Sequence, residues 1–314
     1  MRVCLISLYF GEWPEYINIF LKGCRHNPSV DFILFSDCGS LPRSPENVHV
    51  EPITLQDVRE RVHDCIGVKP NIKTPYHLCD FKPTYGDLFG DYLSGYDYWG
   101  YTDIDLIYGD INQFIGDYLF SERDIISVRP WWLTGFFFIF KNEDRINKLY
   151  KKSRSYREVF CGQNYYNFDE CGFAWEEIRS GNPVFSTSSE IESITEVIKK
   201  ESNDGNIDVI FDNSAQENIE DGFVLWENGE ISYISREKLL LHFVSLKSKY
   251  HFVFPGWKYI PNKFYIDSTG FYRPHEFSGL SYFKYMKKSD IIIAATGRLL
   301  QKVKNQFSKI KRLL

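Results

Sequence analysis

The stretch that decides the fold is residues 3–37, VCLISLYFGEWPEYINIFLKGCRHNPSVDFILFSD. Its first eight residues form a short apolar run that ends at Gly11, which predicts a buried strand. Pro14 opens a pattern with apolar residues at helical spacing, and residues 31–37 form a second apolar run. A strand, a helix and a strand in this order predict a βαβ unit, and therefore a parallel sheet.

The rest of the chain continues this alternation. Further strands are expected at residues 96–102, 136–140 and 239–243, and a helix broken at Lys82-Pro83 is expected at 77–93. Asn228-Gly229 between apolar runs predicts a tight hairpin. We therefore expect an α/β fold: a mostly parallel sheet flanked by helices, with a small β-hairpin region and a C-terminal helical tail.

Two domains are expected. The core is assigned to residues 1–255, with residues 188–222 as an acidic surface segment or insertion, and the extension to residues 256–314. The last 31 residues carry a net charge of +8 in a chain of −5, so the first 283 residues carry −13. Apolar residues of the tail fall on one face of a helix, which favours either a membrane-surface element or a helix packed on its own domain.

Composition excludes several classes of protein. The net charge of −5 argues against a nucleic-acid partner, and the chain has neither GxGxxG nor GxxxxGK[ST]. Its seven cysteines are scattered without a CxxC pair, which favours reduced thiols. With no signal-peptide pattern and no apolar run near 20 residues, a cytoplasmic location is expected, peripheral on the inner face of the cell membrane if the tail binds lipid.

Asp103 and Asp105 are the first candidates for chemistry, because they follow an aromatic, strand-like run. In an extended segment, residues i and i+2 point the same way, so both carboxylates can meet one cation. Such oxygen ligands suit Mg²⁺ or Mn²⁺, and these ions in turn suit a diphosphate. The alternative is a solvated turn or a helix cap, because so short a pattern is common by chance.

Three further side chains fit the same site. His242, in an apolar strand, is either a core histidine or a third metal ligand. Lys247 and Lys82 are cations that suit phosphates, although Lys82 has the alternative of a plain surface lysine. Ligands of parallel sheets bind beyond the carboxyl ends of the strands, which here means Leu8, Tyr9, Phe10, Gly11 and Asp37.

Asp169 and Glu170 form a second acidic cluster. Either carboxylate is a candidate for a site role, such as a general base. The alternative is an N-cap for a helix at residues 173–179. Trp131 and Trp132 are either a flat binding surface or core residues.

Together these motifs resemble those of GT-A-fold glycosyltransferases, over most of residues 1–255. The resemblance rests on Leu-Tyr-Phe-Gly at 8–11, Cys-Asp-Phe-Lys-Pro at 79–83, Gly-Tyr-Thr-Asp-Ile-Asp-Leu-Ile-Tyr-Gly-Asp-Ile at 100–111, Phe-Asp-Glu-Cys-Gly at 168–172 and His-Phe at 242–243. The chain is similar to a poorly characterised family of bacterial polysaccharide glycosyltransferases, and more distantly to the glycogenin and lipopolysaccharide-galactosyltransferase type. It lacks the glycine after His-Phe and the Lys-Pro-Trp that usually end that last motif.

The resemblance implies a role for each candidate. Asp103, Asp105 and His242 would hold Mn²⁺ or Mg²⁺, and Lys82, Asp103 and Lys247 would address the diphosphate of a nucleotide sugar, UDP above all. The residues at 8–11 and Asp37 would hold the uracil and ribose. Asp169 or Glu170 would be the general base beside the acceptor hydroxyl, or would bind the acceptor or donor sugar. Trp131 and Trp132 would form an acceptor platform. The acceptor would be a cell-surface polysaccharide or a lipid-linked glycan. The rival functions are a nucleotidyltransferase that makes a nucleotide sugar and a non-catalytic glycan-binding or peripheral membrane protein.

Overall fold

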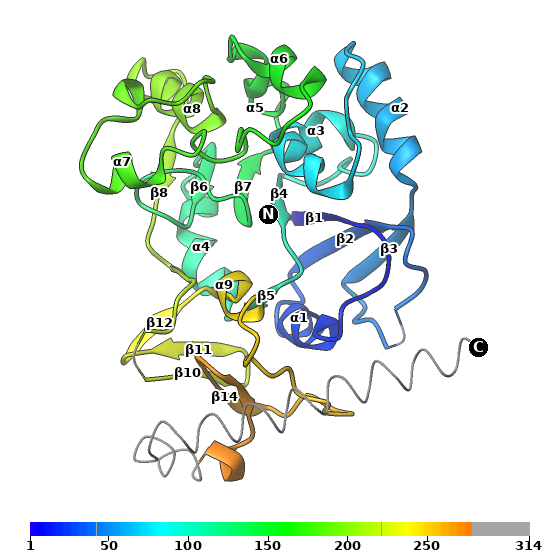
Figure 1. Ribbon diagram of the computed structural model, residues 1–314, viewed down its shortest axis with the longest axis vertical. Coiled ribbons are helices and arrows are strands. Elements are labelled where there is room, and N and C mark those ends of the chain that lie inside the picture. The colour runs from blue at the N-terminus through cyan, green and yellow to red at the C-terminus, as the bar shows by residue number, and fades with distance from the viewer. Residues whose placement is uncertain (42, 221, 278–314) are drawn as a thin grey trace.

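A seven-stranded sheet organises the computed structural model, which describes residues 1–41, 43–220 and 222–277 (Figure 1). Its strands, in spatial order, are β3 (Val48–Pro52), β2 (Val30–Ser36), β1 (Val3–Tyr9), β4 (Tyr98–Thr102), β7 (Phe137–Lys141), β6 (Ile125–Ser127) and β8 (Val209–Phe211). The pairs β3–β2, β2–β1, β1–β4 and β6–β8 are parallel, and only β7 runs against its neighbours. The predicted α/β class with a mostly parallel sheet is confirmed.

Helices cover one face of this sheet, and helices with two smaller sheets cover the other (Figure 1). The alternation of β1 shows this, because Val3 and Leu5 pack in one core cluster while Cys4 and Ile6 pack in the other. The α-helices are α1 (Ile17–Arg25), α2 (Leu55–Ile66), α3 (Tyr85–Leu88), α4 (Ile111–Phe120), α5 (Asp144–Asn147), α6 (Tyr156–Cys161), α7 (Trp175–Arg179), α8 (Ile194–Asn203) and α9 (Val244–Lys247). Short 3-10 helices lie at Pro75–Thr84, Leu149–Lys152 and Val184–Ser186.

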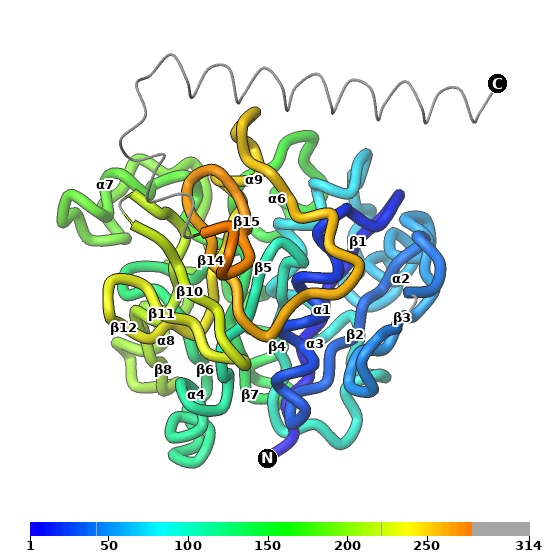
Figure 2. Tube along the Cα trace, turned by 90° about the horizontal axis from the view of Figure 1, so that it is seen from below, coloured from blue at the N-terminus to red at the C-terminus, as the bar shows by residue number. Residues whose placement is uncertain are grey.

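Two smaller sheets complete the fold. One has the order β12 (Arg236–Lys238), β11 (Glu230–Tyr233), β10 (Val224–Glu227), β14 (Lys263–Asp267) and β15 (Gly270–Tyr272), and Figure 2 shows it on one side of the molecule. The other has the order β5 (Leu106–Tyr108), β13 (Leu240–His242) and β9 (Ala215–Gln216). The predicted hairpin is confirmed at β10–β11, where Asn228 and Gly229 both have positive φ.

Several segments differ from expectation. The helix expected at 77–93 is a 3-10 helix followed by the single turn α3, since Pro83 removes a backbone donor. The segment 188–222 contributes α8, β8 in the main sheet and β9 in the three-stranded sheet. Strand β14 pairs with β10, so one sheet joins residues on both sides of position 255.

The predicted basic helix of the tail lies outside the described residues. Within the described residues, no helix combines the length and the apolar character that a membrane crossing requires.

Candidate active site

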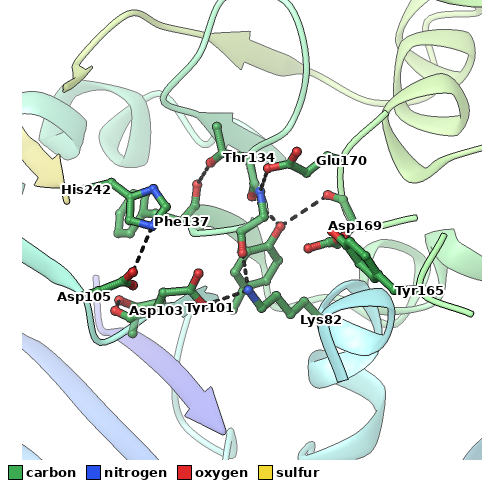
Figure 3. A network of polar contacts seen from close by, with 12 residues as sticks. Lys82, Tyr101, Asp103, Asp105, Thr134, Phe137, Tyr165, Asp169, Glu170 and His242 are labelled. Atoms are coloured by element: carbon green, nitrogen blue, oxygen red, sulfur yellow. Dashed lines mark hydrogen bonds and ion pairs between the residues drawn. The ribbon is translucent and has the colours of Figure 1, made fainter. Parts of the chain in front are cut away.

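Three side chains of the types that bind metals meet beyond the end of β4. Asp103, Asp105 and His242 each offer a ligand atom, and these atoms lie within 4.8 Å of one another (Figure 3). Asp105 and His242 are buried and Asp103 is partly exposed. The two aspartates predicted from the sequence are therefore brought together with the predicted histidine.

The backbone fixes this arrangement from two sides. The Asp103 amide donates to the carbonyl of Phe136 (2.9 Å), just before β7, and the Phe243 amide donates to the carbonyl of Asp105 (3.1 Å). Strand β13 pairs with β5 so that His242 lies opposite Leu106. Residues 104–105 form a bend and not the extended segment that was expected, so the convergence comes from the bend and the β13 pairing.

His242 faces a carboxylate at each ring nitrogen. Nε2 lies 3.4 Å from Oδ2 of Asp105, and Nδ1 lies 3.5 Å from Oε1 of Glu217, whose other oxygen pairs with Arg129. Both ring nitrogens are fully buried, and neither makes a hydrogen bond of good geometry within the described structure. A buried imidazole between two carboxylates suits a metal ligand oriented by an outer carboxylate better than a satisfied core histidine.

The electrostatics of this pocket favour a cation. Burial acts to lower the pKa of His242, but the neighbouring carboxylates, Asp105 first, raise it to about 9. Burial acts to raise the pKa of Asp105, yet His242 and Lys247 beside it bring that pKa below its ordinary value. Two carboxylates and an imidazole form a donor set that suits a divalent ion such as Mn²⁺ or Mg²⁺, so the residues fit the metal that the sequence predicts.

Each of the two aspartates forms an ion pair with a lysine. Lys82 Nζ lies 2.7 Å from Oδ1 of Asp103 and also donates to the carbonyl of Gly135. Lys247 Nζ lies 2.7 Å from Oδ2 of Asp105 and 3.3 Å from the Tyr16 hydroxyl. Lys82 is 8% exposed, so the alternative of a plain surface lysine is wrong.

The acidic pair Asp169-Glu170 lies across Lys82 from the aspartates (Figure 3). The carboxylate of Glu170 already accepts three hydrogen bonds. Their donors are the Gly135 backbone amide (2.6 Å), the Trp175 indole (2.6 Å) and the Asn167 side-chain amide (3.1 Å). Asp169 is buried and accepts from the Tyr165 hydroxyl at 3.1 Å.

The pKa of Asp169 suits a general base, and the acidic pair does not cap helix α7. Burial raises the pKa of Asp169 well above its ordinary value, with Lys82 opposing, which is the direction that a general base at neutral pH requires. Helix α7 begins at Trp175 with Ala174 as its N-cap and no side-chain cap, so the N-cap alternative for the acidic pair is wrong.

Asp80 holds the loop that carries this acidic pair. Its two carboxylate oxygens accept from the backbone amides of Phe168 (2.7 Å) and Tyr166 (2.8 Å), and its side chain is buried. Burial raises the pKa of Asp80 to about 6 although both hydrogen bonds act to lower it. Asp80 therefore positions Asp169 from the 3-10 helix that also carries Lys82.

A cavity of about 480 Å³ connects these groups, lined among others by Lys82, Asp103, Asp169, Glu170 and His242. Trp132 also lines it, whereas Trp131 lies with 43% of its surface exposed and does not.

The strand-end residues lie at the ends of the neighbouring strands β1 and β2. The Gly11 amide donates to Oδ1 of Asp37 (2.7 Å), so these two predicted residues are in contact. Leu8 and Phe10 pack into the core cluster opposite to that of Tyr9, as the alternation of a strand requires. Tyr9 stacks on Trp13 at 5.7 Å.

Sequence reasoning missed Glu217, Arg129 and Asp80. Glu217 lies in the acidic segment that was assigned to the surface, and its partner Arg129 lies 88 positions earlier, so no local spacing connects them. Asp80 was quoted within Cys79-Asp80-Phe81-Lys82-Pro83 without a role. Its position two residues before Lys82, in so hydrophobic a segment, was the available signal.

Residues 5–273 match the model of a family described as a family of unknown function, DUF6625. No curated protein matches the chain in sequence. The proposed function therefore rests on the residues of the site.

Similar solved structures include two transferases. One is the galactosyltransferase LgtC in complex with donor and acceptor sugar analogues, 12% identical over 55% of this chain and 72% of that chain, with a TM-score of 0.32. The other is mouse xyloside xylosyltransferase 1 in its apo form, 7% identical over 77% of this chain and 97% of that chain, with a TM-score of 0.38.

Proposed function

The chain belongs to the DUF6625 family of unknown function, and we propose that it is a metal-dependent glycosyltransferase that moves a sugar from a nucleotide sugar to a glycan acceptor. The observation that carries this proposal is the meeting of Asp103, Asp105 and His242 within 4.8 Å beside a cavity. A bare cation site would not need the two lysines, which are suited to hold a diphosphate next to the cation.

Each charged group of the site then has a role. Asp103, Asp105 and His242 hold the divalent ion, which when bound acts as a Lewis acid on the leaving diphosphate. Lys82 and Lys247 provide fixed positive charge where negative charge develops as the bond between the sugar and the diphosphate breaks. Burial strengthens this effect, because Lys82 has little water around it to screen its charge.

Asp169 is the proposed proton acceptor. In an inverting reaction, the acceptor hydroxyl gives its proton to Asp169, its oxygen forms the new bond to the anomeric carbon, and the nucleoside diphosphate leaves with the electron pair of the broken bond. In a retaining reaction, the same carboxylate would face the donor sugar. Glu170 then shapes the Gly135 turn through its hydrogen bond and does not take the proton.

The sequence motifs support a more specific proposal for the nucleotide of the donor, the metal ion and the class of acceptor. UDP is the proposed nucleotide, held at Tyr9, Gly11 and Asp37, with Mn²⁺ or Mg²⁺ as the ion. The proposed acceptor is a cell-surface polysaccharide or lipid-linked glycan, handled by a cytoplasmic protein at the inner face of the membrane.

The decisive experiment is thermal unfolding of the full chain with UDP, GDP, CMP or dTDP, each with Mn²⁺ or with EDTA. A ligand that binds only the folded state raises the melting temperature. We expect a Mn²⁺-dependent rise with UDP that is lost in Asp105→Asn and kept in Asp117→Asn, a matched change on the exposed side of α4. Hydrolysis of a panel of UDP-sugars then identifies the sugar from the UDP released.

Four outcomes would overturn the proposal. No rise with any nucleotide, or an equal rise in EDTA, would remove the metal-dependent donor site. Formation of a nucleotide sugar from UTP and a sugar 1-phosphate, with release of pyrophosphate, would instead indicate a nucleotidyltransferase. An Asp105→Asn variant that responds like wild type would show that the aspartate pair is not the site.

A further inference from the structure

A second concave site lies on the outer side of α1, away from the aspartate pair. We call it the α1 groove: a cavity of about 440 Å³ between one face of α1 (Asn18, Leu21, Lys22, Arg25), residues 41 and 43, and residues 258–260, with Trp13 at its edge. Figure 2 shows the chain between α9 and β14 passing across α1. The volume falls within the range of about 300–1,000 Å³ typical of small-ligand pockets.

The charge of this groove is one-sided. Lys22, Arg25, Arg43 and Lys258 line it, and no carboxylate of the described chain does. None of these four cations forms an ion pair with an acid within the described residues, in a chain whose first 283 residues carry −13. The four cations repel one another, and the acidic chain offers many carboxylates that could have paired with them. A basic groove whose cations remain unpaired therefore favours an anionic ligand.

The cations are held in place. Arg25 donates to the carbonyl of Arg43 (3.2 Å), and Lys22 donates to the side chain of Asn262 (2.6 Å), which ties α1 to the start of β14. The Arg43 guanidinium lies 5.3 Å from the centre of the Tyr259 ring. Arg43 also has a φ of 66°, an uncommon value for a residue other than glycine. A prearranged set of cations loses little entropy when it binds an anion.

Aromatic rings accompany the cations. Tyr259 is 64% exposed, and Trp13 is held by a hydrogen bond from its indole to the carbonyl of Gly39 (3.1 Å). Exposed rings offer flat, amphipathic surfaces, which suit the apolar faces of sugar rings, whereas a simple anion needs no such surface. The groove thus combines contacts for rings with contacts for negative charge.

We propose that the α1 groove binds a saccharide that carries carboxylate or phosphate groups. The anionic groups meet Arg25, Arg43, Lys22 and Lys258, and a sugar ring packs on Tyr259. None of the residues proposed to hold the metal or the nucleotide lines this groove, although Trp13 of the groove stacks on Tyr9 of the proposed nucleotide site. The proposal does not require the transferase activity, because binding here uses neither the metal nor the nucleotide.

The test is isothermal titration of the full chain in EDTA, without nucleotide, using four probes. These are tetragalacturonate, a phosphorylated maltotetraose, neutral maltotetraose and a tetraglutamate peptide. We expect binding of one or both anionic saccharides, weakened by salt, and no binding of maltotetraose or tetraglutamate. The two anionic saccharides distinguish a carboxylate ligand from a phosphate ligand.

Variants connect binding to the groove. Arg25→Gln/Arg43→Gln is expected to weaken binding by roughly tenfold or more, because contacts to charged groups are lost. The matched control is Arg154→Gln/Arg157→Gln, which removes the same charge around α6, at the other end of the molecule (Figure 1). Tyr259→Ala should also weaken binding, and Tyr259→Phe should restore it because the ring is kept.

Three results would overturn the proposal: no binding of either anionic saccharide, equal binding of tetraglutamate, or equal losses in the two double variants. UDP release by the Arg25→Gln/Arg43→Gln variant from a donor sugar should be unchanged. A failure of this inference therefore leaves the proposed transferase intact, and the reverse also holds.

Discussion

Replacing Glu217 by Gln tests whether the site is a metal centre with an oriented histidine. Glu217 lies outside the metal-ligand cluster of Asp103, Asp105 and His242; it acts through His242, whose Nδ1 lies 3.5 Å from its Oε1. A carboxylate at Nδ1 fixes the proton on that nitrogen and leaves Nε2, which faces Asp105 at 3.4 Å, free for a cation. Gln keeps the size of the side chain and removes the charge.

The expected loss follows from that geometry. Removal of an outer-shell partner of a metal-bound histidine costs about 10–100-fold in metal affinity, or about 1.4–2.7 kcal/mol. Asp105→Asn removes a direct ligand and should cost more. Glu158→Gln, an exposed change on α6 with the same loss of charge, should leave the affinity unchanged.

The assay is titration of Mn²⁺ followed by the electron paramagnetic resonance signal of the free ion, with full-length protein and no nucleotide. Thermal unfolding of each variant shows that it is folded, which matters because Glu217→Gln leaves the guanidinium of Arg129 without its carboxylate. A folded Glu217→Gln protein that binds Mn²⁺ as tightly as wild type would refute the orienting role.

Three further predictions concern other parts of the site and the core. Asp169→Asn should lower the rate of sugar transfer about 10²–10⁴-fold in a steady-state assay and leave Mn²⁺ affinity unchanged; an unaltered rate would exclude a base role. Because burial raises the pKa of Asp80 from 3.8 to about 6, the folded protein retains a proton that the unfolded chain releases, so this group lowers stability by about 3 kcal/mol as pH rises from about 4 to 6. Denaturant unfolding of wild type and Asp80→Asn at several pH values should show that difference in slope, and parallel curves would contradict it. A Cβ at Gly86 would lie 2.4 Å from the Trp99 indole, so Gly86→Ala should cost about 1–3 kcal/mol in denaturant unfolding, whereas Gly256→Ala, with open space around it, should cost far less.

The sequence predicted the parts of the fold that depend on local pattern. The apolar strands and the Asn228-Gly229 turn were found because periodicity and turn chemistry act over a few residues. Helix α2 was not predicted, although Thr54 and Asp57 form a capping box at its start and Gly67 ends it in the left-handed conformation.

The site was predictable only as a set of separate candidates. Asp103 and Asp105 stand together in sequence, but His242 reaches them through the antiparallel pairing of β13 with β5, more than 130 positions away. Glu217 was invisible for the same reason, because its meaning depends on His242 and Arg129 and not on its neighbours in the chain. Spacing along the chain could not group His242 with the two aspartates; the resemblance to GT-A-fold glycosyltransferases suggested that grouping.

The pairing of charges in the site argues for function over stability. Asp103 pairs with Lys82 and Asp105 pairs with Lys247, each at 2.7 Å and each with one buried partner, and His242 lies between Asp105 and Glu217. Buried ion pairs contribute little to stability because desolvation offsets their attraction, so such a cluster is weak evidence for a structural role. A divalent cation on the carboxylates together with an anionic group on the lysines would exchange one set of pairs for another and leave no buried charge uncompensated. A lone cation would instead compete with both lysines for the aspartates. We therefore expect the metal and the nucleotide each to bind more tightly when the other is present. Titration of Mn²⁺ with and without UDP would show this, and equal Mn²⁺ affinities would contradict the exchange.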